Sequence, residues 1–562
     1  MGDATNTEAE RFAIGISFGN TSSSIARISP EGKVEVIANE EGDRQIPSIL
    51  SYIEGEEYHG TQAKAQLIRN SKNTVAYFRD FLGKEFKAID PTPCHASAHP
   101  EQSSSTVAFT IRDTPSESPN TITVSEITTR HIRRLKQSAA DFLGKEVNAA
   151  VITVPTDFTD AQREALVAAA KAAGVEVLQL IHEPVAAVMA YDARPEAPAV
   201  SDKLVVVADL GGTRSDVAVV ACRGGMYTIL ATAHDYELGG ASLDQIIIDF
   251  FAKEFIKKHK TDPREDARGL AKLKLECEGT RKALSLSANA QLSIESLADG
   301  IDFSSTINRT RYELLSNKVF GQFIDLIQQV IKKAELDVLD IDEVIFSGGV
   351  SHTPKIAQLA SNIFPEKTVI LAPSTLTTAI NPSELSARGA AFQASLVQEF
   401  DVEDIEQSIH PMVTVIPHLT KAIGVEFSSG SELAFTPLLN VATALPARRI
   451  AQYSAPKEGG DVLIRVCEGA HEIKVTKPEP KAKQEKPADD EDSDFDSDEE
   501  EEDIREIIWK TEKPIAELAV KGIKAGGKVE VMVHVNPDLG LQITAREVGG
   551  STAVRGAING SA

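Results

Sequence analysis

The sequence predicts an α/β fold with two related lobes, followed by a small antiparallel β domain. Strand and helix patterns alternate up to about residue 400, which is typical of α/β proteins. Residues 14–23 and 206–216 share one pattern, an apolar strand that runs into a polar turn rich in Gly, Ser and Thr. Beyond residue 400, short segments of alternating hydrophobicity indicate half-buried antiparallel strands.

The composition is that of a globular protein without a membrane span. The 562 residues predict roughly three to four domains, and no apolar run approaches the roughly 20 residues that a spanning helix needs. Residues 1–11 are polar, lack the features of a signal peptide and are expected to be disordered. Four widely spaced cysteines fit a reducing compartment, and no Cys or His cluster has metal-ligand spacing. We therefore expect a cytoplasmic protein without membrane contact.

The net charge of −25 is concentrated in one segment. Twelve of the fifteen positions from Asp489 to Asp503 are Asp or Glu. Because like charges at this density repel each other, residues 477–503 are predicted to be a disordered acidic insertion in the β domain. The acidity of the chain also argues against direct nucleic-acid binding, which needs clustered Lys and Arg.

Hydrophobic periodicity places the elements of the α/β part. Strands are predicted at 147–154, 175–181, 204–209, 217–222 and 343–346, and helices at 156–173, 185–191, 243–260, 275–284 and 312–333. In the β domain, strands are predicted at 421–427, 461–466 and 472–475, and a hairpin at 528–546. The third predicted turn, at Gly348 and Gly349, joins a strand to a helix that begins near Pro354.

The two Gly-rich turns favour an anion site. Gly19 and Gly211 allow the backbone to turn sharply and to approach a ligand closely, and successive N–H groups in such turns bind anions. Either turn alone is read more simply as an ordinary hairpin. The two together indicate two lobes that bind one polyphosphate.

Several motifs in order resemble those of the seventy-kilodalton heat-shock chaperones. They are the first turn, residues 73–75, 151–155, 183–187, 209–212, 238–240, 300–303, 348–349 and 381–382. The resemblance implies an actin-like two-lobed nucleotide-binding domain at 12–398, a linker at 399–410, and a truncated β substrate-binding-like domain at 411–562 without a helical lid.

The same resemblance implies ATP as the ligand, with Mg²⁺ as a further candidate cofactor. It assigns phosphate contacts to the two turns, at Gly19, Asn20, Thr21, Gly211, Gly212 and Thr213. It assigns metal-organising acids near the turns, at Glu183, Asp209 and Asp216, the last two through water. It assigns adenosine contacts to Glu278, Arg281, Ser285, Gly348 and Gly349. Arg214 is read either as a phosphate contact or as a surface arginine beside the hairpin.

The departures from the family pattern predict binding without useful turnover. Ser17 stands where active members carry Asp, and Arg79 stands where they carry the catalytic Lys. Thr213 and Arg214 replace a Gly and a Thr. Since phosphoryl transfer depends on accurate positioning of charge, these changes should slow it severely, and no catalytic residue is assigned. The linker is mostly charged or polar, so coupling of nucleotide state to the β domain should be weak.

Within the family, the combination resembles the atypical member of the fungal ribosome-associated complex. The resemblance implies a cytoplasmic, ribosome-associated protein in a stable heterodimer with a zuotin-like J-protein. That partner would bring it to the ribosome, where the two would activate a second chaperone of the same family. The alternatives are an active peptide-binding foldase ATPase, or a nucleotide-exchange cochaperone, whose long helical extension is not evident after Thr552.

Overall fold

The computed structural model describes residues 11–114, 118–195, 202–409, 417–429, 432–476, 504–550 and 552–560. These residues form two compact units, one within Met1–Cys222 and Ile229–Thr414 and the other within Arg223–Thr228 and Val415–Ala562. The predicted acidic insertion at 477–503, and all of the predicted N-terminal tail except Arg11, lie outside the described residues.

The first lobe of the first unit is built on a six-stranded sheet. Its strand order is β12-β11-β1-β2-β3, with β4 beside β2. The strands of this lobe and its helices are β1 (Ala13–Phe18), β2 (Ser22–Ile28), β3 (Val34–Ile37), β4 (Ile46–Pro47), β5 (Ile49–Ile53), β6 (Glu56–His59), β7 (Thr74–Ala76), β8 (Pro100–Ser103), β9 (Thr106–Ile111), β10 (Asn120–Thr123), β11 (Ala149–Val154), β12 (Glu176–His182), α1 (Gly60–Ala65), α2 (Val124–Leu143) and α3 (Asp160–Ala172). Helix α3 begins later than predicted because Thr159 and Gln162 form a capping box that fixes its start.

The second lobe is built on a five-stranded sheet in the order β15-β14-β13-β18-β19. Its elements are β13 (Lys203–Leu210), β14 (Ser215–Arg223), β15 (Met226–Asp235), β16 (Asn289–Ala298), β17 (Ile301–Asn308), β18 (Glu343–Ser347), β19 (Val369–Leu371), α5 (Gly240–His259), α6 (Ala267–Leu286), α7 (Arg309–Lys333) and α8 (Pro354–Ser361). A core rich in phenylalanine, including Phe251, Phe255 and Phe320, fills it.

The two central sheets correspond strand by strand. Strand β1 pairs antiparallel with β2 and parallel with β11, and β13 pairs antiparallel with β14 and parallel with β18. The turn between β1 and β2 and the turn between β13 and β14 therefore take equivalent places. These are the two Gly-rich turns, and the correspondence explains why their sequences look alike.

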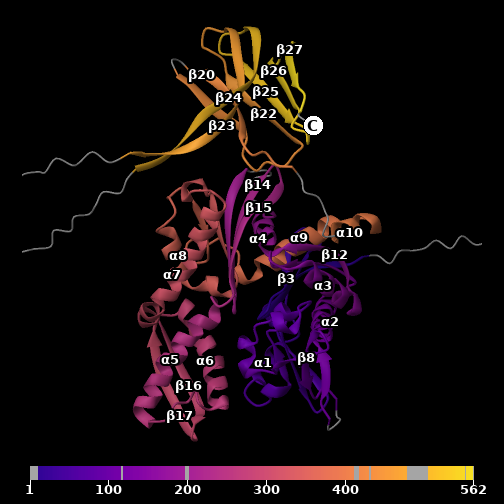
Figure 1. Cartoon of the computed structure of the whole chain (residues 1–562), viewed down its shortest axis with the longest axis vertical. Coiled ribbons are helices and arrows are strands. Elements are labelled where there is room, and N and C mark those ends of the chain that lie inside the picture. The colour runs from indigo at the N-terminus through magenta and orange to yellow at the C-terminus, as the bar shows by residue number, and fades with distance from the viewer. Residues whose placement is uncertain are drawn as a thin grey trace, which may run out of the picture. The chain divides into compact units, whose positions relative to one another are not determined.

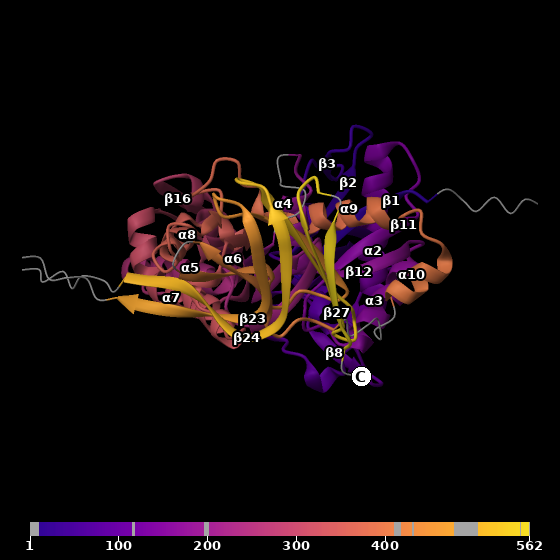
Figure 2. The same cartoon turned by 90° about the horizontal axis from the view of Figure 1, so that it is seen from above.

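Two helices lie between the lobes, α4 (Glu183–Asp192) and α9 (Leu385–Val397) (Figures 1 and 2). They approach each other so closely that a Cβ at Gly389 would lie 1.9 Å from the carbonyl oxygen of Ala186. Glycine is therefore required at this crossing. The crossing fixes the start of α4, where Glu183 follows strand β12 directly.

The segment predicted to be a linker contains a short helix, α10 (Val402–Ile409). Asp401 accepts a hydrogen bond from the N–H of Asp404 in its first turn. The side chain of Ile405 is buried among apolar residues that include Leu178 and Val397. The buried Ile405 therefore packs this charged helix against the first unit.

The second unit contains two four-stranded sheets, ordered β21-β20-β23-β24 and β22-β25-β26-β27. The strands are β20 (Ala422–Ser429), β21 (Glu432–Leu439), β22 (Ala447–Ser454), β23 (Gly460–Thr476), β24 (Ile504–Ile523), β25 (Lys528–Val535), β26 (Leu541–Glu547) and β27 (Ala553–Ile558). Strands β23 and β24 continue past their neighbours as a two-stranded ribbon (Figure 2). Strand β23 is continuous where the sequence predicts two strands, because register shifts near Cys467 and Gly469 interrupt its alternation.

Candidate nucleotide-binding site

A cavity of about 1010 Å³ opens between the two lobes of the first unit. Its lining includes both Gly-rich turns and every predicted site residue: Gly19, Asn20, Thr21, Glu183, Asp209, Gly211, Gly212, Thr213, Arg214, Asp216, Glu278, Arg281, Ser285, Gly348 and Gly349. The volume is that of a site for a small-molecule cofactor. The structure thus brings the predicted residues together, and their individual roles in binding stay predictions.

The two Gly-rich turns meet across the cavity. The side-chain amide of Asn20 donates to Oγ1 of Thr213 at 3.1 Å, and a Cβ at Gly212 would lie 2.6 Å from the Thr21 side chain. Within the described residues, no hydrogen bond from the backbone N–H groups of Asn20, Thr21, Gly212 or Thr213 is found. These four donors at one end of the cavity suit an anionic ligand.

Each turn is held from behind by hydrogen bonds. In the first, Oγ of Ser48 donates to the carbonyl of Gly19 at 2.7 Å. Oγ of Ser23 lies 2.9 Å from Oγ of Ser48 and 3.0 Å from Nε2 of His131. Burial lowers the pKa of His131 to about 3, so this imidazole is neutral near pH 7.

In the second turn, the N–H of Gly211 donates to the carbonyl of Arg214 at 3.0 Å. The N–H groups of Gly240 and Ala241, at the start of α5, donate to the carbonyls of Gly211 and Gly212 at 3.0 and 2.8 Å. Gly211 therefore uses its N–H to close the turn, while α5 fixes the turn from outside.

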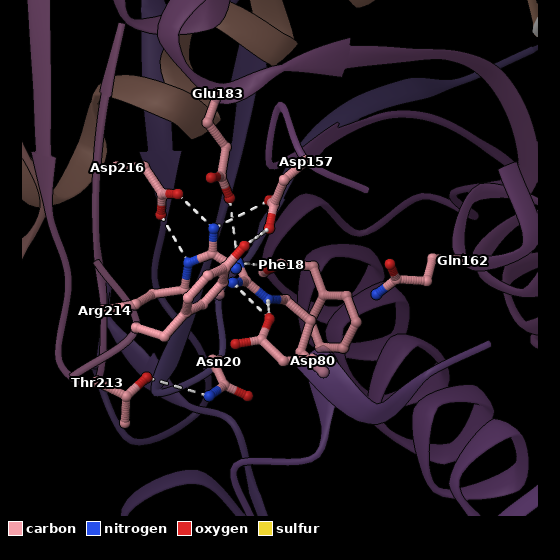
Figure 3. A network of polar contacts seen from close by, with 12 residues as sticks. Phe18, Asn20, Asp80, Asp157, Gln162, Glu183, Thr213, Arg214 and Asp216 are labelled. Carbon is pink, nitrogen blue, oxygen red and sulfur yellow. Dashed lines mark hydrogen bonds and ion pairs between the residues drawn. The ribbon is translucent and has the colours of Figure 1, made fainter. Parts of the chain in front are cut away.

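Arg214 is buried in a network of acids beside the second turn (Figure 3). Its Nε donates to Asp216 at 2.8 Å and its Nη2 to Asp157 at 2.9 Å, and Nη2 also donates to the second oxygen of Asp216. The guanidinium lies 4.6 Å from the ring centre of Tyr236, whose hydroxyl donates to Asp157 at 2.7 Å. Arg214 is thus a buried residue of the site and is not a surface arginine.

Arg79 has a similar environment in the first lobe. It begins a single turn of 3₁₀ helix, Arg79–Phe81, which follows β7. Its Nε donates to Asp80 at 2.8 Å, and its Nη1 donates to Glu183 at 3.2 Å. Only 5% of Arg79 and 6% of Arg214 are exposed, so both cations lie out of bulk water and depend on these acids.

The pKa values of the three acids shift in different directions, up for Glu183 and Asp209 and down for Asp216. Burial raises the pKa of Glu183 to about 8, although the Arg79 charge opposes the rise. Burial and the charge of Asp216 raise the pKa of Asp209 to about 6. Burial also acts against ionisation of Asp216, but hydrogen bonds from His234 and Arg214 outweigh it and lower its pKa. Asp216 is therefore the firmly ionised partner of Arg214.

The opposite end of the cavity carries the residues predicted to hold adenosine. Glu278 accepts from Lys64 at 2.6 Å and from Lys282 at 2.7 Å. These two ammonium groups outweigh burial and lower the pKa of Glu278 to about 2. Arg281 is buried and donates to Asp244 at 2.6 Å. Lys64 belongs to α1 and Glu278 to α6, so their ion pair joins the two lobes.

The Gly348 turn closes this end of the cavity. Gly348 has φ = +83°, and a Cβ there would lie 2.4 Å from the carbonyl of Leu210. Since only glycine tolerates both conditions, this residue lets the end of β18 approach the end of β13. Ser285 lines the same region, where its Oγ donates to the carbonyl of Arg281 at 3.4 Å.

Sequence reasoning missed several residues that the structure places in the site or against it. They are Lys64, Asp80, His131, Asp157, His234, Tyr236 and Asp244. One signal was available for Asp157, which follows the parallel strand β11 at its carboxyl end. Ligand sites of α/β proteins gather at that edge. Tyr236 and His234 lie after or within β15, where the sequence pattern alone indicates only a strand.

Comparison with known proteins decides the family. A model of the Hsp70 protein family matches residues 13–481 of the chain. The chain belongs to the Hsp70 family. The predictions of Hsp70 membership and of a two-lobed α/β fold followed by a β domain are confirmed.

Two fungal Hsp70 relatives are similar along nearly the whole chain. It is 45% identical over 545 residues to the ribosome-associated complex subunit SSZ1 of Saccharomyces cerevisiae, covering 97% of this chain and 99% of that protein. It is 44% identical over 557 residues to heat shock protein 70 homolog C57A7.12 of Schizosaccharomyces pombe, covering 98% and 96%. Heat shock 70 kDa protein 14 of Xenopus tropicalis is 32% identical, with 81% of this chain and 87% of that protein covered.

Hsp70 proteins generally bind ATP with Mg²⁺, so the acids of the cavity can be tested for their fit to this ion. Mg²⁺ requires a nearly octahedral shell of carboxylate, phosphate and water oxygens. Both oxygens of Asp216 accept from Arg214, and Glu183 accepts from Arg79. Asp157, Asp216 and His234 have ligand atoms within 4.8 Å of one another, but Nη2 of Arg214 bridges the two aspartates. Asp157, Asp216 and Glu183 therefore do not fit a hydrated Mg²⁺ ion. Of the two residues predicted for the metal, Asp216 is engaged by Arg214, and Asp209 lines the cavity without an arginine contact among the described residues.

A search for membrane spans among the described residues found no helix with the length and apolar character to cross a bilayer.

Proposed function

We propose that this Hsp70-family chain binds ATP in the cavity between its lobes and does not hydrolyse it at a useful rate. The phosphates would contact the first turn (Gly19, Asn20, Thr21) and the second (Gly211, Gly212, Thr213, Arg214). Glu183, Asp209 and Asp216 would face them, and Glu278, Arg281, Ser285, Gly348 and Gly349 would hold the adenosine.

One observation carries this proposal. Arg79 stands where active members have a catalytic lysine, and its guanidinium donates to Asp80 and Glu183. A guanidinium is wider than an ammonium group and does not deprotonate. To reach an attacking water, it would have to give up its hydrogen bonds to the buried Glu183 and the partly buried Asp80, and a buried polar group left without its partner is unfavourable. Ser17 supplies no carboxylate beside it.

We further propose that the chain acts as a non-catalytic subunit beside a J-protein. The support is its similarity to a protein named as a ribosome-associated complex subunit. In this model it forms a stable heterodimer with a zuotin-like J-protein in the cytoplasm and binds the ribosome through that partner. The pair helps a second, active Hsp70 to fold nascent chains.

The proposed domains are a nucleotide-binding domain at 12–398, a linker at 399–410 and a truncated β domain at 411–562. In the β domain, strands β22 and β27 end one sheet, and Ile450 and Ile558 on them are exposed. An exposed sheet edge can accept an extended segment from a partner. We propose that the J-protein adds a strand at such an edge.

Titration calorimetry and a single-turnover assay on the full chain test the nucleotide proposal. We expect saturable ATP binding. In the single-turnover assay, we expect no more ADP to form than forms in a control without protein. The Arg79→Lys variant is the matched control, since it restores the ammonium group. Turnover by the unchanged chain at the rate of an active Hsp70 would contradict the proposal.

Native mass spectrometry of the endogenous protein tests the partner. The expected species is a one-to-one complex with a J-protein that carries one ATP. Hydrogen exchange on that complex should show backbone protection in β22 or β27 compared with the free chain. A free monomer would argue against the proposed heterodimer, and protection limited to the first unit would argue against strand addition at β22 or β27.

A further inference from the structure

Two arginine side chains, Arg79 and Arg214, place positive charge in the cavity. Arg79 donates to the carbonyl of Phe18, the residue before the first Gly-rich turn, at 3.4 Å. Arg214 lies beside the second turn (Figure 3). Both line the cavity, and both are buried. Each donates a hydrogen bond to a different acid of the cavity, Arg79 to Glu183 and Arg214 to Asp216. Two fixed cations thus face the end of the cavity where the free N–H donors of the turns gather.

The guanidinium of Arg214 retains donors that the protein does not use. It has five N–H groups in a planar fork, and its Nε and Nη2 are satisfied by Asp157 and Asp216. None of the described residues accepts from its Nη1. Nη1 therefore has two hydrogens available to a ligand in the cavity. Arginine pairs well with phosphate because this fork matches two of its oxygens.

The same contacts engage two of the three acids predicted to organise a metal ion, Glu183 and Asp216, whereas Asp209 has no arginine contact among the described residues. An incoming Mg²⁺ would need the oxygens of Asp216 and Glu183, directly or through water, and would also lie near two fixed positive charges. Like charges repel strongly in a buried environment. The chemistry of the site therefore favours the arginines over the ion.

We propose that Arg79 and Arg214 supply the positive charge that Mg²⁺ supplies in other family members, so that the cavity binds a nucleoside triphosphate without a divalent metal. This inference rests on the nucleotide binding proposed above. Arg214 is then a ligand-binding residue through its Nη1, and Arg79 is a positioning residue whose guanidinium is held in the cavity by its hydrogen bond to Glu183.

The experiment measures the Kd of ATP for the full chain by titration calorimetry in excess EDTA and in excess Mg²⁺. We expect the Kd in EDTA to be equal to or lower than that in Mg²⁺, because free ATP presents all its charge to the arginines. Electron paramagnetic resonance with Mn²⁺ and ATP gives a second readout. We expect no signal from protein-bound Mn²⁺.

The Arg214→Thr variant restores the residue typical of the family. We expect its Kd in EDTA to rise by at least about tenfold, the loss of one good charge-assisted contact, and Mg²⁺ to recover part of that loss. The Arg214→Lys variant should lie between the two. Arg264→Thr is the matched control, since Arg264 pairs with Asp249 and Asp262 outside the cavity, and its Kd should not change.

The outcomes separate the two proposals. Absence of ATP binding in both buffers would overturn the proposed function and this inference with it. Binding by the unchanged chain that weakens more than about tenfold in EDTA would overturn this inference alone. The inference also fails if Arg214→Thr binds ATP in EDTA as well as the unchanged chain does. If that variant does not fold, the buffer comparison and the Mn²⁺ signal of the unchanged chain decide.

Discussion

The two Gly-rich hairpins have the same backbone plan and differ in the side chains that support them. Uncharged groups support the β1–β2 turn, with Ser48, Ser23 and His131 in a chain of hydrogen bonds behind it. The β13–β14 turn is surrounded by charges, with Arg214 between two aspartates. Both turns are closed by backbone hydrogen bonds or hydroxyl contacts that do not depend on the residues facing the cavity.

This difference shows which parts of the site can change independently. Turn geometry depends on glycines whose missing Cβ makes room for backbone atoms. The charges that face the ligand come from side chains outside those constraints. A family site can therefore keep its shape while Ser17, Arg79 and Arg214 change its chemistry.

The largest expected effect comes from adding a methyl group to either turn. A Cβ at Gly19 would lie 2.2 Å from the backbone oxygen of Ser22, whereas one at Gly212 meets the side chain of Thr21, which can rotate. We expect Gly19→Ala to reduce the free energy of unfolding by about 3 kcal/mol and Gly212→Ala by about 1 kcal/mol. Calorimetric unfolding of the full chain measures both. Equal losses would mean that the two turns are equally rigid.

A loss of unfolding free energy of similar size is expected when the charges around the β13–β14 turn are changed. Asp216 accepts from Nε and Nη2 of Arg214 and from His234, while Asp157 accepts from Arg214 and Tyr236. Replacing one partner of a buried pair leaves the other uncompensated, so we expect Asp216→Asn to cost about 3 kcal/mol. Asp157→Asn should cost about 1 kcal/mol. Denaturant unfolding gives the values. The reverse order would show that Asp157 is the main partner of Arg214.

The uncharged hairpin should instead respond to acid. The pKa of His131 is about 3 in the folded protein, below the usual 6.5, because burial disfavours its charged form. The unfolded chain therefore binds an extra proton between about pH 6.5 and 3, and stability falls as the pH falls through that window. From pH 7 to 5, this group should remove about 2 kcal/mol.

The His131→Gln variant is the control for this pH effect. It cannot take up a proton, so the difference in unfolding free energy between wild type and variant should shrink on acidification. Thermal unfolding from pH 7 to 5 measures that difference. A constant difference would mean that His131 is protonated in the folded state or contributes nothing to the acid response.

The smallest expected effect concerns the ion pair that joins the lobes of the two hairpins. Lys64→Ala removes the 2.6 Å contact with Glu278 and should weaken ATP binding by about threefold, as partly exposed pairs contribute little. Lys282→Ala also removes a pair with Glu278, but one within α6, and should weaken binding less because it leaves the connection between the lobes in place. Titration calorimetry compares the two variants. Equal effects would mean that the charge of Glu278 matters and the connection between lobes does not.

Much of the fold was predictable because it depends on local patterns. The strands and helices predicted in the two lobes lie within a few residues of their observed bounds, apart from the starts of α3, which a capping box sets, and of α6, which begins eight residues before the predicted helix. Other elements, such as α2 and the strands β5 to β10, were not predicted. The last strand, β27, was missed because residues 553–558 show no clear alternation, and its partner β26 supplies the pairing. The continuous strand β23 was missed because bulges hide its period.

For the candidate site, the sequence by itself determined part of the set of residues that gather. The family's motifs, in their order along the chain, named residues that all line one cavity. Only the tertiary structure decided what Arg214 does. Its partners Asp157 and Tyr236 are 57 and 22 residues away along the chain, and no local pattern links them to it. Side-chain ion pairs between distant segments form only when packing brings the segments together, so the sequence gives a cation's position and the fold gives its partners.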